Sequence, residues 1–512
     1  MKFPSQLRSL CLIGTLLLAP CALLHAQLTN GQDASYVLGQ ANFTTSTASN
    51  GQNGFTAPAD VVFDNATGKI FVVDTVNNRI LRFGSAAAVA GGSSAEAVIG
   101  QPNFTTYTAK TTQTGLNGPF GATMDSAGNL WVADTGNNRV VAYANAATVA
   151  SGSASAFIVL GQKDFLTGTT TTPSQYTMDG PTSVAVDSTG TLYVMDRTYN
   201  RVLRFANAAT RSNGAFADGL FGQSNFLANG TGITQSTFGA TPWAVAVDTM
   251  GNLWVADTTN NRVLRFASAS TASVGSNATS VLGQADFTSG ASSTSQTGFN
   301  GPVQLALDSL NRLYVTDTVN NRVLIFNNPS TSSFLSPAAV VIGQNNFASN
   351  GSGTTQSTLK APFGLACSNT GYLWVADQGN NRVLSYAEIS GMPSISTHPV
   401  KLSIRPGQTK RFSVNLMNSQ SSDAYTLSLS VPKGTTSKAS VLFYLNGTDV
   451  TSQLKSGTYE TTGVLPANQQ LSFSVKVKAR ATAIGQLKFT LSATSQTDSS
   501  VKATNISTIQ VK

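Results

Sequence analysis

The sequence is poor in charge, cysteine and histidine. Only 11% of its 512 residues are charged, against roughly 25% in an average soluble protein. The charges do not gather in runs, which argues against coiled coils and against acidic or basic disordered tails. The chain has two histidines, His25 and His398, and both lie outside its long central part. A zinc site built on imidazole or on several thiols is therefore excluded from that part.

Glutamate is also scarce, and this limits acid–base chemistry. Between residues 27 and 394 the glutamates are Glu96 and Glu388 alone. What the chain does have is 45 glycines, 41% hydrophobic residues and long stretches of Ser, Thr and Asn. This composition argues against helical bundles and indicates a β-rich, loop-rich protein with a large core.

The first 26 residues have the pattern of a signal peptide. Lys2 and Arg8 precede an apolar stretch, and Ala26 offers a small residue for cleavage. We expect export to the periplasm, the cell surface or the medium. Removal of this segment leaves Cys367 as the one thiol, so no disulfide is expected. No later segment reaches the roughly 18 apolar residues of a membrane helix, and we expect no transmembrane segment.

A motif of the form Asp-x-x-Asn-Asn-Arg, or a close variant, occurs six times at intervals of 60 to 62 residues. A catalytic site needs one such group, whereas a repeated turn needs all six. Asp and Asn side chains satisfy backbone donors in tight turns and can receive the Arg fork. We predict this structural role for Asp74, Arg79, Asp134, Arg139, Asp196, Arg201, Asp257, Arg262, Asp317, Arg322, Asp377 and Arg382.

Each motif copy sits in the same framework of short strands. A proline precedes an alternating apolar strand, a second strand carries an aromatic residue, and a third strand follows the arginine. A short segment ending in Gly-Gln lies between copies, and one more copy, residues 37–40, precedes the first repeat while none follows the sixth. We predict six four-stranded blades, with the N-terminal strand completing the last blade and removing an open edge.

These residues, with the run from Asp134 to Val140 among the best copies, resemble the NHL repeat, although Arg stands where the name-giving motif has His. The resemblance extends over residues 35–388 and implies a β-propeller. Some NHL-type enzymes and the related streptogramin lyases use channel histidines, and strictosidine-synthase-like propellers use Glu. No position here can be matched to those residues.

The repeat period stops after residue 390, and the charge changes. Residues 395–512 carry 13 Lys and Arg against 4 Asp and Glu. We predict a propeller over 27–390, a linker over 391–399 and a β-sandwich over 400–512, since its segments alternate in polarity. The sandwich resembles the immunoglobulin-like accessory modules of bacterial secreted proteins, which implies display or adhesion. Its basic excess indicates either attraction to anionic envelope polymers or a solvated surface, and we expect no nucleic-acid partner.

One position in the repeats differs between blades. Aromatic residues follow the inner-strand proline in alternate blades, as Phe120, Trp243 and Phe363. In a closed ring they would start the innermost strands at the channel mouth and could grip a ligand. The alternative is that they fill the channel as hydrophobic core. Asp60 is a non-repeated carboxylate near an inner strand, where calcium is an alternative to our expectation of no metal and no cofactor.

Two classes of function follow. The first is a secreted or envelope binding and scaffold module that recognises a peptide, glycan or protein at the channel mouth. The second is a channel enzyme, a lactonase or a lyase, using Asp or an oxygen-ligated metal. The scarcity of His and Glu favours the first class, so we predict that the protein is not an enzyme.

Overall fold

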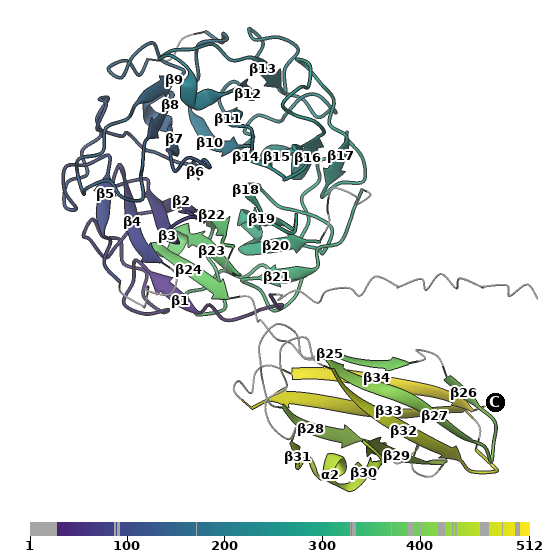
Figure 1. The fold of residues 1–512 in the computed structure, drawn as a ribbon. Coiled ribbons are helices and arrows are strands. Elements are labelled where there is room, and N and C mark those ends of the chain that lie inside the picture. The colour runs from purple at the N-terminus through teal and green to yellow at the C-terminus, as the bar shows by residue number, and fades with distance from the viewer. Residues whose placement is uncertain are drawn as a thin grey trace, which may run out of the picture. The chain divides into compact units, whose positions relative to one another are not determined.

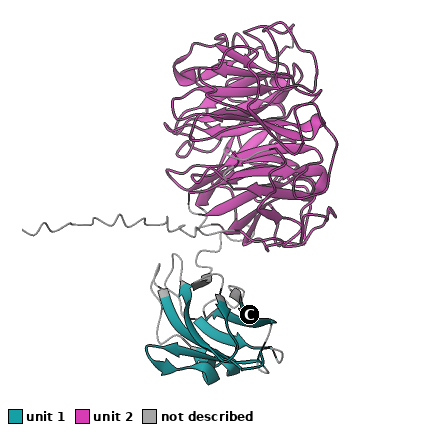
Figure 2. Cartoon of the chain, turned by 90° about the vertical axis from the view of Figure 1, so that its right-hand side faces the viewer, with its two compact units in different colours: residues 1–27, 389–512 teal, residues 28–388 magenta. Residues whose placement is uncertain are grey.

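The structure is a computed structural model, and it describes residues 28–511 with gaps. The gaps lie at residues 86–88, 90–92, 170–171, 328, 330–333, 370, 388–393, 399–401, 418–424, 433–434, 436–437, 461–469, 484 and 497–501. The predicted signal peptide therefore lies outside the described residues. The chain divides into two compact units, one of residues 28–388 and one that contains residues 389–512 (Figure 2).

The first unit is a β-propeller, as predicted. It holds six four-stranded antiparallel sheets arranged in a ring (Figure 1). We call each sheet a blade and number the blades 1 to 6 along the chain. Each sequence repeat supplies the three inner strands of one blade, and the segment that ends in Gly-Gln supplies the outermost strand.

The strands of the blades have the following bounds. The innermost strands are β2 (Pro58–Phe63), β6 (Ala122–Met124), β10 (Pro181–Val186), β14 (Ala244–Val247), β18 (Pro302–Leu307) and β22 (Pro362–Cys367). The second strands are β3 (Lys69–Asp74), β7 (Leu130–Asp134), β11 (Leu192–Asp196), β15 (Leu253–Asp257), β19 (Leu313–Asp317) and β23 (Tyr372–Asp377). The third strands are β4 (Arg79–Ser85), β8 (Arg139–Tyr143), β12 (Arg201–Phe205), β16 (Arg262–Phe266), β20 (Arg322–Phe326) and β24 (Arg382–Ala387). The outermost strands are β5 (Ala97–Ile99), β9 (Ile158–Leu160), β13 (Gly219–Phe221), β17 (Ser280–Leu282), β21 (Val340–Ile342) and β1 (Tyr36–Leu38).

The N-terminal strand β1 completes blade 6. It pairs antiparallel with β24, with Tyr36 opposite Ser385 and Leu38 opposite Val383. The sheet order β1-β24-β23-β22 joins residues more than 300 positions apart in the sequence. The predicted closing strand is thus confirmed, and β24 has no open edge along this pairing.

Aromatic residues of the second strands form the core between blades. Their exposed fractions are between 0% and 2% for Phe71, Trp131, Tyr193, Trp254, Tyr314 and Trp374. Trp374 of blade 6 packs in one cluster with Val61 and Ile70 of blade 1. Because both faces of each sheet are covered by neighbouring blades, the second strands are apolar at nearly every position rather than at alternate ones.

The Gly-Gln pair after each outermost strand anchors a long loop. Gly283 has φ of +89°, and a Cβ there would lie 2.3 Å from the ring of Phe299. Gln284 donates from Nε2 to the carbonyls of Asn261 and Ala291, both at 2.9 Å. Only glycine fits both the backbone angle and the close ring, which explains why the pair recurs.

The second unit is built from two five-stranded sheets. The first sheet has the order β25-β27-β32-β29-β30 and the second has the order β26-β34-β33-β28-β31. The first sheet consists of β25 (Ser394–His398), β27 (Thr409–Met417), β32 (Gln470–Ala479), β29 (Ala439–Leu445) and β30 (Thr448–Asp449). The second sheet consists of β26 (Leu402–Ile404), β34 (Lys502–Val511), β33 (Gly485–Ser495), β28 (Tyr425–Ser430) and β31 (Tyr459–Glu460). A short helix, α2 (Thr451–Ser456), follows β30.

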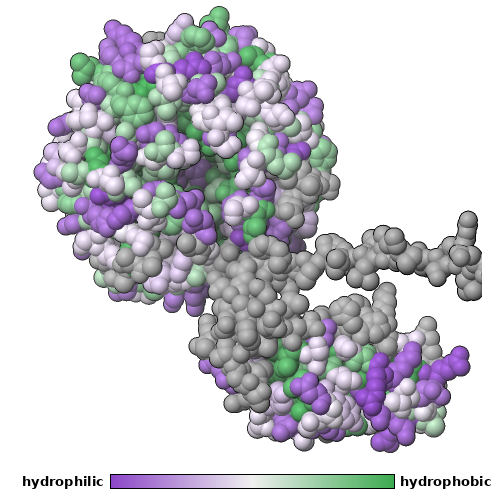
Figure 3. All heavy atoms as spheres, in the orientation of Figure 1, coloured by the Kyte–Doolittle hydropathy of each residue, from purple (hydrophilic) through white to green (hydrophobic). Residues whose placement is uncertain are grey.

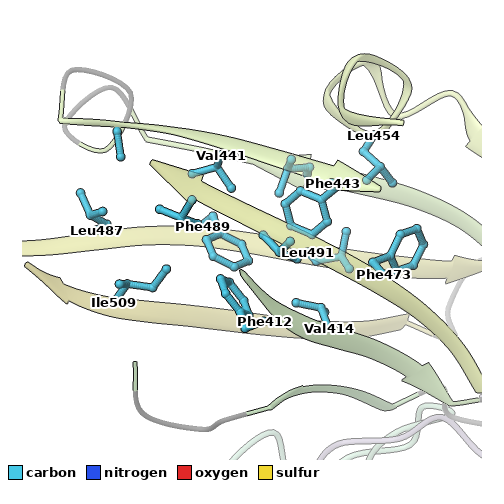
Figure 4. Close-up of a cluster of buried hydrophobic side chains, with 14 of the residues drawn as sticks. Phe412, Val414, Val441, Phe443, Leu454, Phe473, Leu487, Phe489, Leu491 and Ile509 are labelled. Atoms are coloured by element: carbon cyan, nitrogen blue, oxygen red, sulfur yellow. The ribbon is translucent and has the colours of Figure 1, made fainter. Parts of the chain in front are cut away.

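One hydrophobic core lies between these two sheets. Phe412 and Phe473 of the first sheet pack in the same cluster as Phe489 and Leu491 of the second (Figure 4). The unit is therefore a β-sandwich, in which alternate residues of each strand face the partner sheet. The immunoglobulin-like assignment stays a prediction.

The predicted linker was too long. Residues 394–398, which we expected in the linker, form β25 and pair with β27. Ser394–His398 has the sequence Ser-Ile-Ser-Thr-His and is flanked by two prolines, Pro393 and Pro399. Prolines commonly stand at the ends of strands, so this spacing is compatible with one short strand. The elements β29, β34 and α2 were not predicted from the sequence either. No helix among the described residues is long and apolar enough to cross a membrane.

Candidate functional site

The six repeated turns form a buried hydrogen-bond system on one face of the propeller. In blade 2, Asp134 accepts the backbone N–H of Asn117 at 2.7 Å on Oδ1. Its Oδ2 accepts Arg139 Nε at 2.7 Å and Asn137 Nδ2 at 2.8 Å. Both charged side chains are fully buried. The same Arg Nε to Asp Oδ2 distance, 2.7 Å, recurs in all six blades.

These turns also connect neighbouring blades. Arg139 donates to the carbonyl of Phe165, in the loop after β9, at 2.6 Å. Asn138 adopts the left-handed conformation with φ of +52°, and its Oδ1 accepts the N–H of Gly180 in blade 3 at 2.9 Å. The described partners of the carboxylate and the guanidinium are groups of the protein itself, which is what a structural role requires.

Phe120, Trp243 and Phe363 lie at the channel mouth on the face that carries these turns. The three rings contact one another across the ring of blades. The centroid distances are 5.4 Å between Phe120 and Trp243, 5.4 Å between Trp243 and Phe363, and 5.8 Å between Phe120 and Phe363. Each side chain remains half-buried. The three rings close the channel at this mouth, and each ring also exposes part of its surface. The cluster therefore fills the channel and still offers a surface to a ligand. We call this cluster the aromatic floor.

Arg197 stands next to the aromatic floor. Its guanidinium carbon lies 4.2 Å from the centroid of the Trp243 ring. The structure gives it no ion pair among the described residues, and its Nε has no hydrogen-bond partner there. Partial burial lowers the pKa of Arg197, although a guanidinium stays charged at neutral pH. In blades 2, 4 and 5 a threonine occupies the same place and donates to the proline carbonyl of the next blade.

The repeat family can now be assigned. A family model described as "NHL repeat" matches residues 116–143, 240–266 and 299–326. The chain contains NHL repeats. The three matched NHL repeats cover the three inner strands and the turns of blades 2, 4 and 5. The Arg–Asp bond of the turn recurs in the other three blades.

Comparison with solved structures finds propeller folds at low identity. A virginiamycin B lyase from Staphylococcus aureus is 13% identical with a TM-score of 0.34, over 65% of this chain and 84% of the lyase. A protein of unknown function from Bacteroides thetaiotaomicron is 13% identical with a TM-score of 0.45, over 70% of this chain and 76% of that one. A chain of a nidogen/laminin complex is 15% identical with a TM-score of 0.34, over 56% and 84%. None of the curated proteins compared with the sequence matches it.

Further along the innermost strands the NHL propeller encloses a cavity of about 330 Å³. All six innermost strands line it, and Figure 3 shows a hollow at the centre of the ring on the face in view. Asp60 lies in its wall and is 3% exposed. Burial raises the pKa of Asp60 to about 7, opposed by hydrogen bonds from Ala122, Val61 and Gln304.

Polar and small residues alternate next to the aromatic floor. The position after Ala59, Thr182 and Val303 holds Asp60, Ser183 and Gln304, in blades 1, 3 and 5, whereas blades 2, 4 and 6 have Gly121, Ala244 and Gly364. The polar side chains reach the next blade: Asp60 Oδ2 accepts the N–H of Ala122 at 3.0 Å, and Ser183 Oγ accepts that of Val245 at 3.2 Å.

This alternation is steric as well as polar. A Cβ on Gly364 would lie 2.3 Å from Asp60 Cα, so blade 6 leaves room for the Asp60 backbone. The sequence pattern pointed to Asp60 and the aromatic residues but not to Ser183, Gln304 and Arg197. A comparison of the six repeats at the Asp60 position would have found Ser183 and Gln304. Arg197 would have been found because it replaces the threonine that follows the turn aspartate in other blades.

Asp60 is the one carboxylate among the residues that line the cavity. No group of three or more His, Cys, Asp or Glu gathers anywhere in the part of the chain that the structure describes. Both oxygens of Asp60 face backbone N–H donors, from Val61 at 2.9 Å and from Ala122 at 3.0 Å. Calcium needs several converging oxygen ligands, and the calcium alternative stays a prediction.

Proposed function

We propose that the chain is an exported NHL-repeat propeller that acts as a binding or scaffold module, without catalysis. It recognises a peptide, glycan or protein partner at the channel mouth that carries Phe120, Trp243 and Phe363. The observation that supports this most strongly is the contact of three half-exposed rings from alternate blades. Concave apolar surfaces with a few placed polar groups are typical of ligand sites.

The equivalent residues of the other blades argue against simple filling of the channel. Blades 1, 3 and 5 carry Ala59, Thr182 and Val303 at this position, and all three are buried. A channel closed for stability alone needs apolar volume but no aromatic surface left in contact with water. The three rings of the floor instead keep part of their surface exposed to solvent, where a ligand can reach it.

Arg197 defines the chemistry of the ligand further. An unpaired guanidinium held over an aromatic ring offers a fork of donors and a positive charge at the edge of the floor. A carboxylate or another anionic group on the ligand satisfies both. We therefore expect the recognised segment to combine an apolar or ring-shaped part with an acidic group.

Two variants matched to other blades test this site. Trp243→Val installs the residue of blade 5, and Arg197→Thr installs the residue of blades 2, 4 and 5. The probe is an array of glycans and peptides, with and without calcium, followed by titration of the mature protein with each hit. We expect Trp243→Val to weaken a hit at least tenfold, about 1.4 kcal/mol, and Arg197→Thr to weaken acidic hits selectively.

The thermal stability of the same variants separates recognition from filling. If Trp243 is a ligand platform, the melting temperature of Trp243→Val stays within a few degrees of the parent protein. A loss of about 3–5 kcal/mol in unfolding free energy, with unchanged ligand affinity, would show that the floor is core. Loss of binding on calcium removal would assign a metal to the site.

The second unit is proposed as a spacer or anchor. Its excess of Lys and Arg would draw it to anionic polymers of the envelope, and such attraction falls as salt rises. We propose no nucleic-acid partner for it.

One observation supports the alternative that the protein is an enzyme. Asp60 is a buried carboxyl in the wall of a cavity, and its pKa of about 7 suits proton transfer at neutral pH. A lactonase or lyase reaction would use it as general acid or base. Turnover of a lactone panel that disappears in Asp60→Asn but persists in Trp243→Val would favour this alternative over binding alone.

A further inference from the structure

A shared hydrogen bond identifies which loop positions correspond in the six blades. In each blade the carbonyl of a loop glutamine accepts the N–H of an alanine before the outermost strand. The bond joins Gln175 and Ala217 at 2.9 Å in blade 3, and Gln235 and Ala278 at 2.8 Å in blade 4. The residue after the glutamine and the residue before the alanine are therefore equivalent from blade to blade.

Blade 3 alone has aromatic residues at both of these positions. Tyr176 follows Gln175, and Phe216 precedes Ala217. The counterparts of Tyr176 are Asn53, Thr114, Ser236, Thr297 and Ser357, and those of Phe216 are Asp33, Ser94, Ser155, Asn277 and Pro337. Since five blades fold with small or polar residues there, the fold does not require the two rings.

The two rings form an exposed pair. Their centroids are 6.0 Å apart in an edge-to-face arrangement, and the exposed fractions are 55% for Tyr176 and 46% for Phe216. Arg211 lies beneath Phe216 with its guanidinium carbon 5.8 Å from the ring, and its charge is neutralised by Asp218. The two rings therefore form an aromatic surface that is in contact with water and is supported by the contact between Arg211 and Phe216.

A groove of about 370 Å³ runs beside Tyr176. Lys163, Thr169, Thr177 and Gly214 are among the residues that line it. It lies on the outer wall where blades 2 and 3 meet, because Gly161–Lys163 follow the outermost strand β9 and Gly214 precedes the outermost strand β13. The N–H of Gly214 bonds to the carbonyl of Val159 at 2.9 Å, and Figure 1 shows where these two strands lie.

Lys163 gives this groove its charge. It is the one charged residue among those that line the groove, its side chain is exposed, and the structure shows no ion pair for its Nζ among the described residues. The equivalent residues after each Gly-Gln pair are Ala41, Pro102, Ser224, Ala285 and Asn345. Lys163 follows β9 and begins the loop that leads into blade 3, so this loop departs from the repeat as blade 3 does.

We propose that this outer-wall groove binds an acidic saccharide chain. The CH faces of pyranose rings are apolar and stack on aromatic rings, which matches Tyr176 and Phe216. Sugar hydroxyls match the threonines and backbone groups of the groove, and a sugar carboxylate matches Lys163. An apolar peptide would cover Lys163 without satisfying its charge, which is costly. The site is separate from the channel mouth and does not depend on the function proposed there.

The test converts blade 3 to the residues of blade 4. The variants are Tyr176→Ser, Phe216→Asn and Lys163→Ser. Blade 4 and the loop that leads into it already hold Ser236, Asn277 and Ser224 at these places. The full mature chain is titrated calorimetrically with a galacturonic acid hexamer and with the methyl ester of the same hexamer. We expect the parent protein to bind the acid at least tenfold more tightly than the ester.

Each variant has its own expected result. Tyr176→Ser and Phe216→Asn should weaken both ligands at least tenfold, whereas Lys163→Ser should abolish the preference for the acid. The titrations are repeated in the Trp243→Val background, where the channel mouth is disabled. We expect the same dependence on Tyr176, Phe216 and Lys163 there, so failure at this groove and failure at the channel mouth are distinguishable. The proposal is overturned if neither hexamer binds, if Lys163→Ser keeps the preference, or if Tyr176→Ser loses only peptides of a matched array.

Discussion

At the scale of single residues, the departures from the repeat carry more information than the repeat itself. Positions shared by all blades, such as Asp134 and Arg139, are explained by bonds within the turn and to the next blade. Arg197, Tyr176 and Asp60 are not repeated, and the other blades carry different residues at the equivalent positions. Each lies at a cavity, a groove or the channel mouth. The repeats thus provide an internal reference for what folding alone requires.

Ser368 shows what one departure costs. In blades 2 and 4 the aspartate of the first hairpin accepts an indole N–H: Asp125 from Trp131 at 3.0 Å and Asp248 from Trp254 at 3.1 Å. Blade 6 has Ser368 at that position, and Nε1 of Trp374 is buried without a partner.

We predict that Ser368→Asp stabilises the protein by about 1 kcal/mol, because a buried donor gains an acceptor. The measurement is the unfolding free energy in denaturant. In a Trp374→Phe background the same substitution should give no gain. An equal gain in both backgrounds would mean that the indole is not involved.

Asp60 gives a pH dependence with a defined sign. Its pKa is about 7 in the folded protein against 3.8 without the fold, so between these values the folded state binds more protons than the unfolded state. The stability that the protonated carboxyl contributes is complete below pH 3.8 and is lost as pH rises through 7. Burial also raises the pKa of the six turn aspartates, which adds to the same trend.

We predict that Asp60→Asn loses less stability than the parent protein between pH 5 and pH 8. The full shift corresponds to at most about 4 kcal/mol. Thermal melts of both proteins across this range measure the difference, and the turn aspartates cancel because both proteins contain them. Parallel curves would show that Asp60 titrates as an exposed carboxyl does.

At the scale of elements, the strands of the repeated blades could be predicted from the sequence, whereas several strands of the non-repeated sandwich could not. The six prolines, the aromatic second strands and the Gly-Gln pairs predicted every strand class of the propeller, since each has a fixed place in a blade. The sandwich has no repeated copies that can be compared with one another. Its strands β29, β34 and β25 were therefore not predicted. Their pairing partners are 30 or more residues away in some cases, as for β29 and β32, and local pattern does not record such pairing.

The site was predictable only in part for the same reason. The aromatic residues of the floor could be found because they share one repeat position. Their mutual contact, the place of Arg197 over Trp243 and the bond from Gln304 to Asp60 depend on how all six blades come together. A sequence lists these residues but does not state the distances across a ring.

At the scale of the whole molecule, closure of the ring decides how the propeller resists unfolding. A linear array of blades would have frayed ends, whereas here residues 36–38 and 382–387 share one sheet. Loss of that sheet would uncover both the edge of β24 and the cluster around Trp374, in which Leu38 is fully buried. If the closed ring is part of the stable fold, β1 should contribute as much to the free energy of unfolding as the outermost strand of any other blade.

We therefore predict that Leu38→Ala and Leu282→Ala destabilise the protein equally, by about 3 kcal/mol each. Both leucines are fully buried and both end an outermost strand before a Gly-Gln pair, so the lost contacts are matched. Denaturant unfolding of the mature chain measures the two effects, and hydrogen exchange of β24 and β16 locates them. A cost at Leu38 far below that at Leu282, with unprotected amides in β24, would mean that β1 is a loosely held arm and that the ring is open in solution.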